Sequence, residues 1–135
     1  VAGAPLSSFA NAGGNGVVGN LTNSTATLGL TNTNFDNATL DGLGVTATNS
    51  TFHGAVSNGS FNNAGQDAMR LTLDSSTGNL GLTNVSATNA AGNGLVITGI
   101  NGSNSIDSLN NVKLDDAGSD AIHFGADSGS RIQAS

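Results

Sequence analysis

Apolar and polar residues alternate in a short segment that recurs along the chain. In each copy two apolar residues stand two positions apart; the pairs are Leu43/Val45, Met69/Leu71, Leu95/Ile97 and Ile122/Phe124. A period of two buries one face of an extended segment, so the pattern predicts β-strands. Helical spacing of apolar residues and helix-capping signals are missing from the sequence. The chain is therefore expected to be an all-β protein.

The predicted strand belongs to an internal repeat. Similar stretches begin near residues 9, 35, 61, 87 and 114, so the period is 26 residues with one insertion late in the chain. Every stretch has Asn or Asp at its third position, Ala at its fourth, Asn or Asp at its seventh and an apolar residue at its ninth. Five copies of one pattern predict a solenoid of about five coils.

Two further segments complete each repeat. One begins at Leu30 as "LTNTNF" and has relatives at Val56, Leu82 and Leu109. The other carries Leu28, Leu80 and Ile106, which places the insertion between Ile106 and Leu109. Three short strands per coil, separated by turn residues, predict a parallel β-helix in which each strand pairs with its counterparts in the coils above and below.

Asparagine recurs in two columns, where a column is the set of positions made equivalent by the repeat. The first column is Asn11, Asn37, Asn63, Asn89 and Asp116, and the second is Asn32, Asn58, Asn84 and Asn111. An amide side chain can donate to one neighbouring coil and accept from the other. We therefore expect these columns to be structural ladders that satisfy polar groups at tight bends.

The composition suits a narrow stack filled by small side chains. Charged residues make up 9% of the 135 residues and aromatic residues 4%, with no Tyr, Trp or Cys. A net charge of -6 with three Lys+Arg argues against nucleic acid and anionic membranes as partners. No apolar run is long enough for membrane insertion. Without Cys there is no disulfide or thiolate metal site, and no cofactor is predicted.

The phrasing "LTNVSATNAAGNGLVIT", residues 82–98, resembles the right-handed parallel β-helix repeats of pectate-lyase-like proteins and of bacterial autotransporter passengers and adhesins. The resemblance covers nearly the whole chain and implies a right-handed parallel β-helix over residues 1–135 as a single domain. Lyases, hydrolases, phage tailspikes and inert stalks share this architecture, so the resemblance implies fold more strongly than function.

One column of acids is a candidate glycosidase site. Asp41, Asp67 and Asp120 share a column, but Asn15 and Asn93 occupy it as well. Glycoside hydrolysis needs two carboxylates at a set separation. A column that takes Asn equally well indicates a structural part of the coil, so no catalytic residue is predicted. The acidic stretch 115–120 could hold a hard cation, yet its columns hold Asn in other coils, and no metal site is predicted.

Two outward basic residues are the candidate ligand contacts. Arg70 and His123 share a column two coils apart, about 10 Å at the usual strand spacing. Arg70 has no acidic or basic neighbour in that column on the adjacent coils, and the repeat does not explain it. His53 is expected to be a solvated histidine. Sequons, for example at Asn20, Asn49 and Asn84, would mark glycosylation only in a eukaryotic secretory setting.

Neither end of the sequence shows a capping helix or a charged cap. Uncapped coils expose apolar interior and strand edges, so we expect either flanking coils of a longer parent or head-to-tail stacking of copies. The expected function is a non-enzymatic structural module at an extracellular or cell-surface location, an adhesin-like stalk or fibre subunit. The alternative is a polysaccharide-binding or polysaccharide-degrading β-helix fragment. The lack of Tyr and Trp, on which sugar rings stack, weighs against that alternative.

Overall fold

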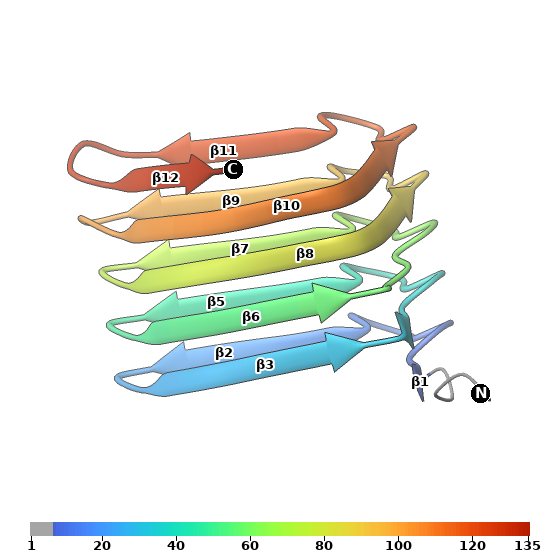
Figure 1. Cartoon of the computed structure of the whole chain (residues 1–135), viewed down its shortest axis with the longest axis horizontal. Coiled ribbons are helices and arrows are strands. Elements are labelled where there is room, and N and C mark those ends of the chain that lie inside the picture. The colour runs from blue at the N-terminus through green and yellow to red at the C-terminus, as the bar shows by residue number, and fades with distance from the viewer. Residues whose placement is uncertain (1–6) are drawn as a thin grey trace.

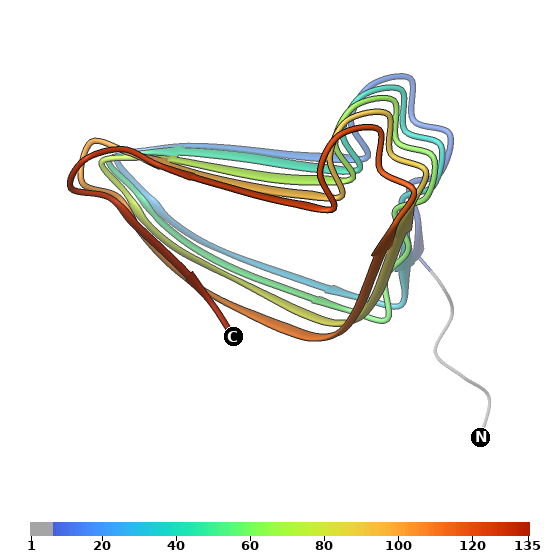
Figure 2. The ribbon, with the colours of Figure 1, turned by 90° about the horizontal axis from the view of Figure 1, so that it is seen from above.

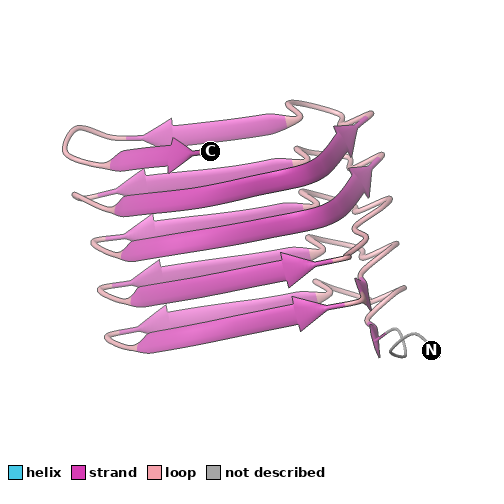
Figure 3. Ribbon diagram, in the orientation of Figure 1, coloured by secondary structure: helices cyan, strands magenta, loops and turns pink. Residues whose placement is uncertain are grey.

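The chain winds into a right-handed parallel β-helix of about five coils. A computed structural model describes residues 7–135, and these form strands and loops with no helix (Figures 1 and 3). Seen from above, the chain runs counter-clockwise as it rises toward the C-terminal coil, which makes the winding right-handed (Figure 2). The fold expected from the repeat and from the family resemblance is confirmed.

Two five-stranded parallel sheets form the long faces of the solenoid (Figure 1). The first sheet contains β2 (Val17–Thr22), β5 (Leu43–Thr48), β7 (Met69–Asp74), β9 (Leu95–Ile100) and β11 (Ile122–Ala126). The second contains β3 (Thr25–Thr31), β6 (Thr51–Ser57), β8 (Thr77–Thr88), β10 (Asn104–Asp115) and β12 (Arg131–Ala134). Each strand pairs with its equivalent one coil away, as the repeat predicts.

The third strand of each coil is short. β1 (Ser7–Ser8) pairs with β4 (Thr33–Asn34), and single bridges continue this sheet from Asn34 to Ser60 and from Ser60 to Ser86. In the next two coils the second and third segments merge into the long, bent strands β8 and β10 (Figure 3). Each coil therefore has three strand segments. In the coils of β8 and β10 the second and third segments form one continuous strand.

Columns of like apolar residues fill the interior. Leu43, Met69 and Leu95 lie in register in the first sheet, and each is at most 1% exposed. Phe35 stacks on Phe61 with ring centroids 4.5 Å apart, and both are fully buried. Burying each such side chain contributes about 1.5 to 3 kcal/mol. Small columns suffice because every residue in a column is covered by the coils above and below it.

The insertion does not lie where the sequence placed it. Ile100 pairs with Asp74, a separation of 26, whereas Asn104 pairs with Thr77, a separation of 27. The extra residue is therefore in the corner at Gly102, which has a positive φ of 77°. Because a shift of one residue exchanges the faces of a strand, Ile106 points outward and is 54% exposed. Asp107 takes the interior position expected for Ile106.

The next coil repeats this wide corner. Arg131 pairs with Asn104, again 27 residues away, so a second extra residue lies in the corner that holds Gly129. Gly129 also has a positive φ, 95°, and an added Cβ on it would come within 3.9 Å of Gly102. The expectation of one insertion is wrong because two stacked corners each carry one.

Asparagine is suited to the corners by its backbone conformation as well as by its side chain. Residues other than glycine with positive φ, between 47° and 61°, are Asn11, Asn23, Asn32, Asn37, Asn49, Asn58, Asn63, Ser75, Asn84, Asn89, Asn101, Asn111 and Asp116. Asn and Asp tolerate this left-handed conformation better than other side chains. The abundance of Asn thus follows from three corners per coil, one of which, at Asn23, Asn49, Ser75 and Asn101, was not recognised from the sequence.

Candidate functional site

The two asparagine columns are hydrogen-bonded from coil to coil. In the first, the Nδ2 groups of Asn37, Asn63 and Asn89 donate to the Oδ1 of the preceding member at 3.2, 3.0 and 3.3 Å. In the second, Asn58, Asn84 and Asn111 donate in the same way at 3.1, 3.0 and 2.8 Å. These exposed amides join the corners of successive coils by hydrogen bonds.

The acid column holds the coils together through backbone hydrogen bonds. The N–H of Asp67 donates to Asp41 Oδ1 at 3.1 Å, and the N–H of Asn93 donates to Asp67 Oδ1 at 2.8 Å. Asn15 and Asn93 accept from the next coil in the same manner. The position requires one oxygen acceptor, which Asn and Asp both supply. This requirement explains why the column takes either residue.

Arg70 has an acidic partner that its own column did not reveal. Its guanidinium forms an ion pair with Asp41, whose side chain is fully buried while that of Arg70 is 43% exposed. Arg70 lies beside Gly44 in the sheet, and an added Cβ on Gly44 would come within 3.2 Å of Asp41 Oδ2. Because Gly44 has no side chain, there is space for the ion pair between Arg70 and Asp41. In the sequence, Asp41 precedes Gly44, the partner of Arg70 in the sheet, by three residues, and this short spacing is the sign that the two side chains could meet.

A small polar hollow lies beside this ion pair on the outer face of the first sheet. It encloses about 170 Å³, and Arg70 and Asp41 share its lining with Asn15, Asn20 and Thr46. The half-exposed guanidinium retains N–H donors beyond the one given to Asp41. The hollow therefore presents hydrogen-bond donors to a hydroxyl or carboxylate group of a ligand.

The two candidate ligand contacts are not brought together. Val96 stands between Arg70 and His123 in their shared column and is 8% exposed. His123 instead lies 3.2 Å from Asp120 in its own coil, with both side chains more than half exposed. His53 Nδ1 lies 3.1 Å from Asn79 Oδ1 on the other sheet. The structure therefore shows separate side-chain pairs and no shared basic site.

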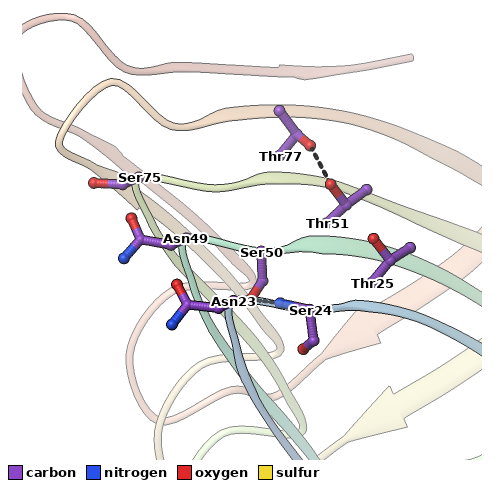
Figure 4. A pocket seen from close by; sticks show the side chains of 8 residues that line it. All are labelled: Asn23, Ser24, Thr25, Asn49, Ser50, Thr51, Ser75 and Thr77. Carbon is purple, nitrogen blue, oxygen red and sulfur yellow. Dashed lines mark hydrogen bonds between the residues drawn. The ribbon is translucent and has the colours of Figure 1, made fainter.

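A serine ladder runs along the third corner and was missed in the sequence. The N–H of Ser50 donates to Ser76 Oγ at 2.9 Å, and the N–H of Ser76 donates to Ser103 Oγ at 3.1 Å. These three serines are at most 7% exposed. The spacing in this ladder changes from 26 to 27 residues between Ser76 and Ser103, in agreement with the extra residue at Gly102. The corner beside them forms a wide, polar hollow lined by Asn, Ser and Thr, including Asn23, Asn49 and Thr51 (Figure 4).

A buried carboxylate in the fourth coil was also missed. Asp107 is 1% exposed and accepts hydrogen bonds from Ser105 Oγ, at 3.0 and 2.9 Å, and from the Leu80 N–H, at 2.8 Å. Burial raises the pKa of Asp107, and the hydrogen bonds from Ser105 and Leu80 oppose that shift. The sequence did not reveal Asp107 as an interior residue, because the corner at Gly102 determines which face of β10 is buried.

These features define a parallel β-helix protein whose recurring polar side chains mostly bond the coils to one another. Within residues 7–135 there is no group of three or more His, Asp or Glu side chains placed to hold a metal ion. The same part of the chain contains no helix long and apolar enough to cross a bilayer. No protein-family model, curated protein or solved structure matches the chain.

Proposed function

We propose that this protein is a non-enzymatic structural module, a stalk or fibre segment at an extracellular or cell-surface location, whose coils stack on further coils. One observation carries the proposal. Ile122 and Phe124 continue the interior columns of Leu95 and Ile97, which are fully buried, yet they are 42% and 41% exposed. A further coil laid on β11 would bury both side chains and pair its open edge.

The polar chemistry of the molecule supports a structural role. Asn, Ser and Asp side chains of the described corners form hydrogen bonds with neighbouring coils, as in the Asn58–Asn32 and Ser50–Ser76 pairs. Charged residues make up only 9% of the chain, so few charged side chains are present to act on a substrate. A surface location is favoured by this composition and by the likeness of the repeat to adhesin-type β-helices.

Sedimentation velocity and electron microscopy over a range of concentrations test the proposal. We expect association and linear particles, and we expect Phe124→Asp to abolish both because a charge would lie in the stacked interior. Ala55→Asp is the matched control, since Ala55 is exposed on the outer face of β6, a strand that is already paired on both sides and that stacking leaves unchanged. A wild-type chain that stays monomeric at high concentration, without filaments, would contradict the proposal.

Binding of an acidic polysaccharide is a second candidate function, favoured by the hollow beside Arg70. A uronate carboxylate or hydroxyl could accept hydrogen bonds from the remaining guanidinium N–H groups. Binding and depolymerisation of polygalacturonate and related polymers would be measured for wild type, Arg70→Ala and Lys113→Ala. A signal lost only with Arg70→Ala supports this candidate, and the absence of any signal removes it.

A further inference from the structure

Three side-chain ladders of the solenoid run in one direction, whereas the serine ladder of Ser50, Ser76 and Ser103 runs in the opposite direction. In each Asn–Asn pair of the two asparagine columns, the later coil donates through Nδ2 and the earlier coil accepts, as in the bond from Asn37 to Asn11. The acid column follows the same rule with backbone donors, as Asp67 does toward Asp41. In these columns each coil presents acceptors to the coil that follows and donors to the coil that precedes.

The C-terminal face consequently presents acceptors. Asn111, Asp116 and Asp120 are the last members of the three columns within the chain, and all three are exposed. Asp116 stands where earlier coils have Asn, and an ionised carboxylate can only accept. Asp120 Oδ2 faces His123, which leaves Oδ1 as the acceptor for a following N–H.

The N-terminal face presents the matching donors. Asn11 Oδ1 accepts from Asn37, so the amide nitrogen of Asn11 is the group that would donate to a preceding coil. Asn15 Oδ1 likewise accepts from the Asp41 N–H, and the N–H of Asn15 is the next donor in that column. In these three columns, two identical faces placed together would set donor against donor or acceptor against acceptor.

The apolar surfaces of the two faces also match. The C-terminal coil has a hollow of about 420 Å³, lined mainly by apolar residues that include Leu109, Leu114 and Ile122. Leu114 ends the column that begins with Phe9, Phe35 and Phe61. Phe9 stacks on Phe35 with centroids 5.4 Å apart and is still 45% exposed. A Phe in the same column of a following coil would enter this hollow.

Charge favours the same arrangement. Residues 7–34 contain no Asp, Glu, Lys or Arg, whereas the last coil has an excess of acids, with Asp115, Asp116, Asp120 and Asp127 against Lys113 and Arg131. Two C-terminal faces would bring these acids together, and like charges repel. The uncharged N-terminal face avoids that repulsion.

We propose that the C-terminal face binds the N-terminal face of a second copy of this chain, with Phe9 of one copy over Leu114 of the other. This inference rests on the proposed stacking function and specifies its partner, polarity and register. The contact joins unlike faces and does not close on itself, so it extends into a fibre.

Cysteine cross-linking tests the register, because the chain has no cysteine of its own. The variant Phe9→Cys with Leu114→Cys places the two thiols four coils apart in one molecule, about 19 Å. A disulfide needs Cα atoms within about 7 Å, so only bridges between molecules can form. We expect a series of oligomers on non-reducing gels, and heterodimers when the two single variants are mixed.

A second pair preserves the apolar contact. Val18 and His123 are the exposed end members of one outward column, so Val18→Cys with His123→Cys should also cross-link between molecules. The mismatched pair Val18→Cys with Leu114→Cys should not. Homodimers of the single Phe9→Cys variant, formed as readily as heterodimers, would overturn the polarity.

The outcomes separate the two proposals. Association of the wild-type chain without the matched cross-links contradicts this interface and leaves coil stacking in place. A wild-type chain that does not associate at any concentration contradicts stacking itself.

Discussion

The backbone N–H of Leu80 donates a 2.8 Å hydrogen bond to Asp107 Oδ1 inside the solenoid. Asp107 stands in the interior column that holds Leu28 and Leu80 in earlier coils. A single extra corner residue, Gly102, turned this carboxylate inward. The interior of the fourth coil therefore holds an ionisable group where the earlier coils have Leu28 and Leu80.

Asp107 should make the protein less stable at neutral pH than in mild acid. Burial raises the folded-state pKa of Asp107 above the ordinary value of 3.8, so the folded state binds this proton more tightly than the unfolded state. Its stabilising contribution is complete below the unfolded pKa and is lost as the pH rises through the folded pKa. Asp107→Asn keeps the acceptor for Leu80 and should be more stable than wild type at pH 7 by about 1 to 3 kcal/mol.

Denaturant unfolding of both proteins from pH 3 to pH 7 measures this difference, and Asp115→Asn at an exposed position serves as the control. A stability difference between wild type and Asp107→Asn that does not change with pH would contradict the assignment.

The Arg70–Asp41 pair should show strong coupling. Arg70→Met leaves the buried Asp41 carboxylate without its charged partner and should cost about 1.5 to 3 kcal/mol of unfolding free energy. In an Asp41→Asn background, which imitates Asn15 and Asn93 of the same column, the same change should cost less than about 1 kcal/mol. A double-mutant cycle by chemical denaturation measures the coupling. Additive effects would show that the pair contributes nothing to stability.

Asn63 should be replaceable by Gly more easily than by Ala. Its φ is 58°, and its amide bonds to Asn37 below and accepts from Asn89 above. Gly loses the ladder hydrogen bonds but adopts positive φ without strain, whereas Ala adds about 1 to 2 kcal/mol of backbone strain. Thermal unfolding should rank wild type above Asn63→Gly and Asn63→Gly above Asn63→Ala. Gln66→Ala, an exposed neighbour, should change little; equal losses for Gly and Ala would argue against the conformational role.

Deleting Gly102 should be tolerated, whereas deleting Ser108 should not. The equivalent corners at Ser50 and Ser76 close without the extra residue, so removing Gly102 keeps Asn104 paired with Thr77. Removing Ser108 slips the rest of β10 by one residue and takes Leu109 and its apolar neighbours out of register, a loss of about 4 kcal/mol or more. Circular dichroism and thermal unfolding of the two deletions decide between them. A folded Ser108 deletion and an unfolded Gly102 deletion would return the insertion to the interval between Ile106 and Leu109.

Sequence periodicity by itself determined the architecture. The alternation around residues such as Met69 and Leu71 predicted strands, and the 26-residue spacing predicted which strands pair. The recurrence of Asn63 and its equivalents marked the corners. These features follow from the sequence because each coil repeats the environment of the last, so a residue's neighbours are its own equivalents one period away.

Tertiary structure alone decided the exceptions to the repeat. The register of Leu109 is the same whether the first extra residue lies at Gly102 or nearer to Leu109, so only the folded corner shows that Asp107 is inside and Ile106 outside. Arg70 reaches past Gly44 to a neighbouring column, a diagonal contact that depends on side-chain length and free space. Column position is a property of spacing, whereas corner closure and diagonal contacts depend on how the coils pack in three dimensions.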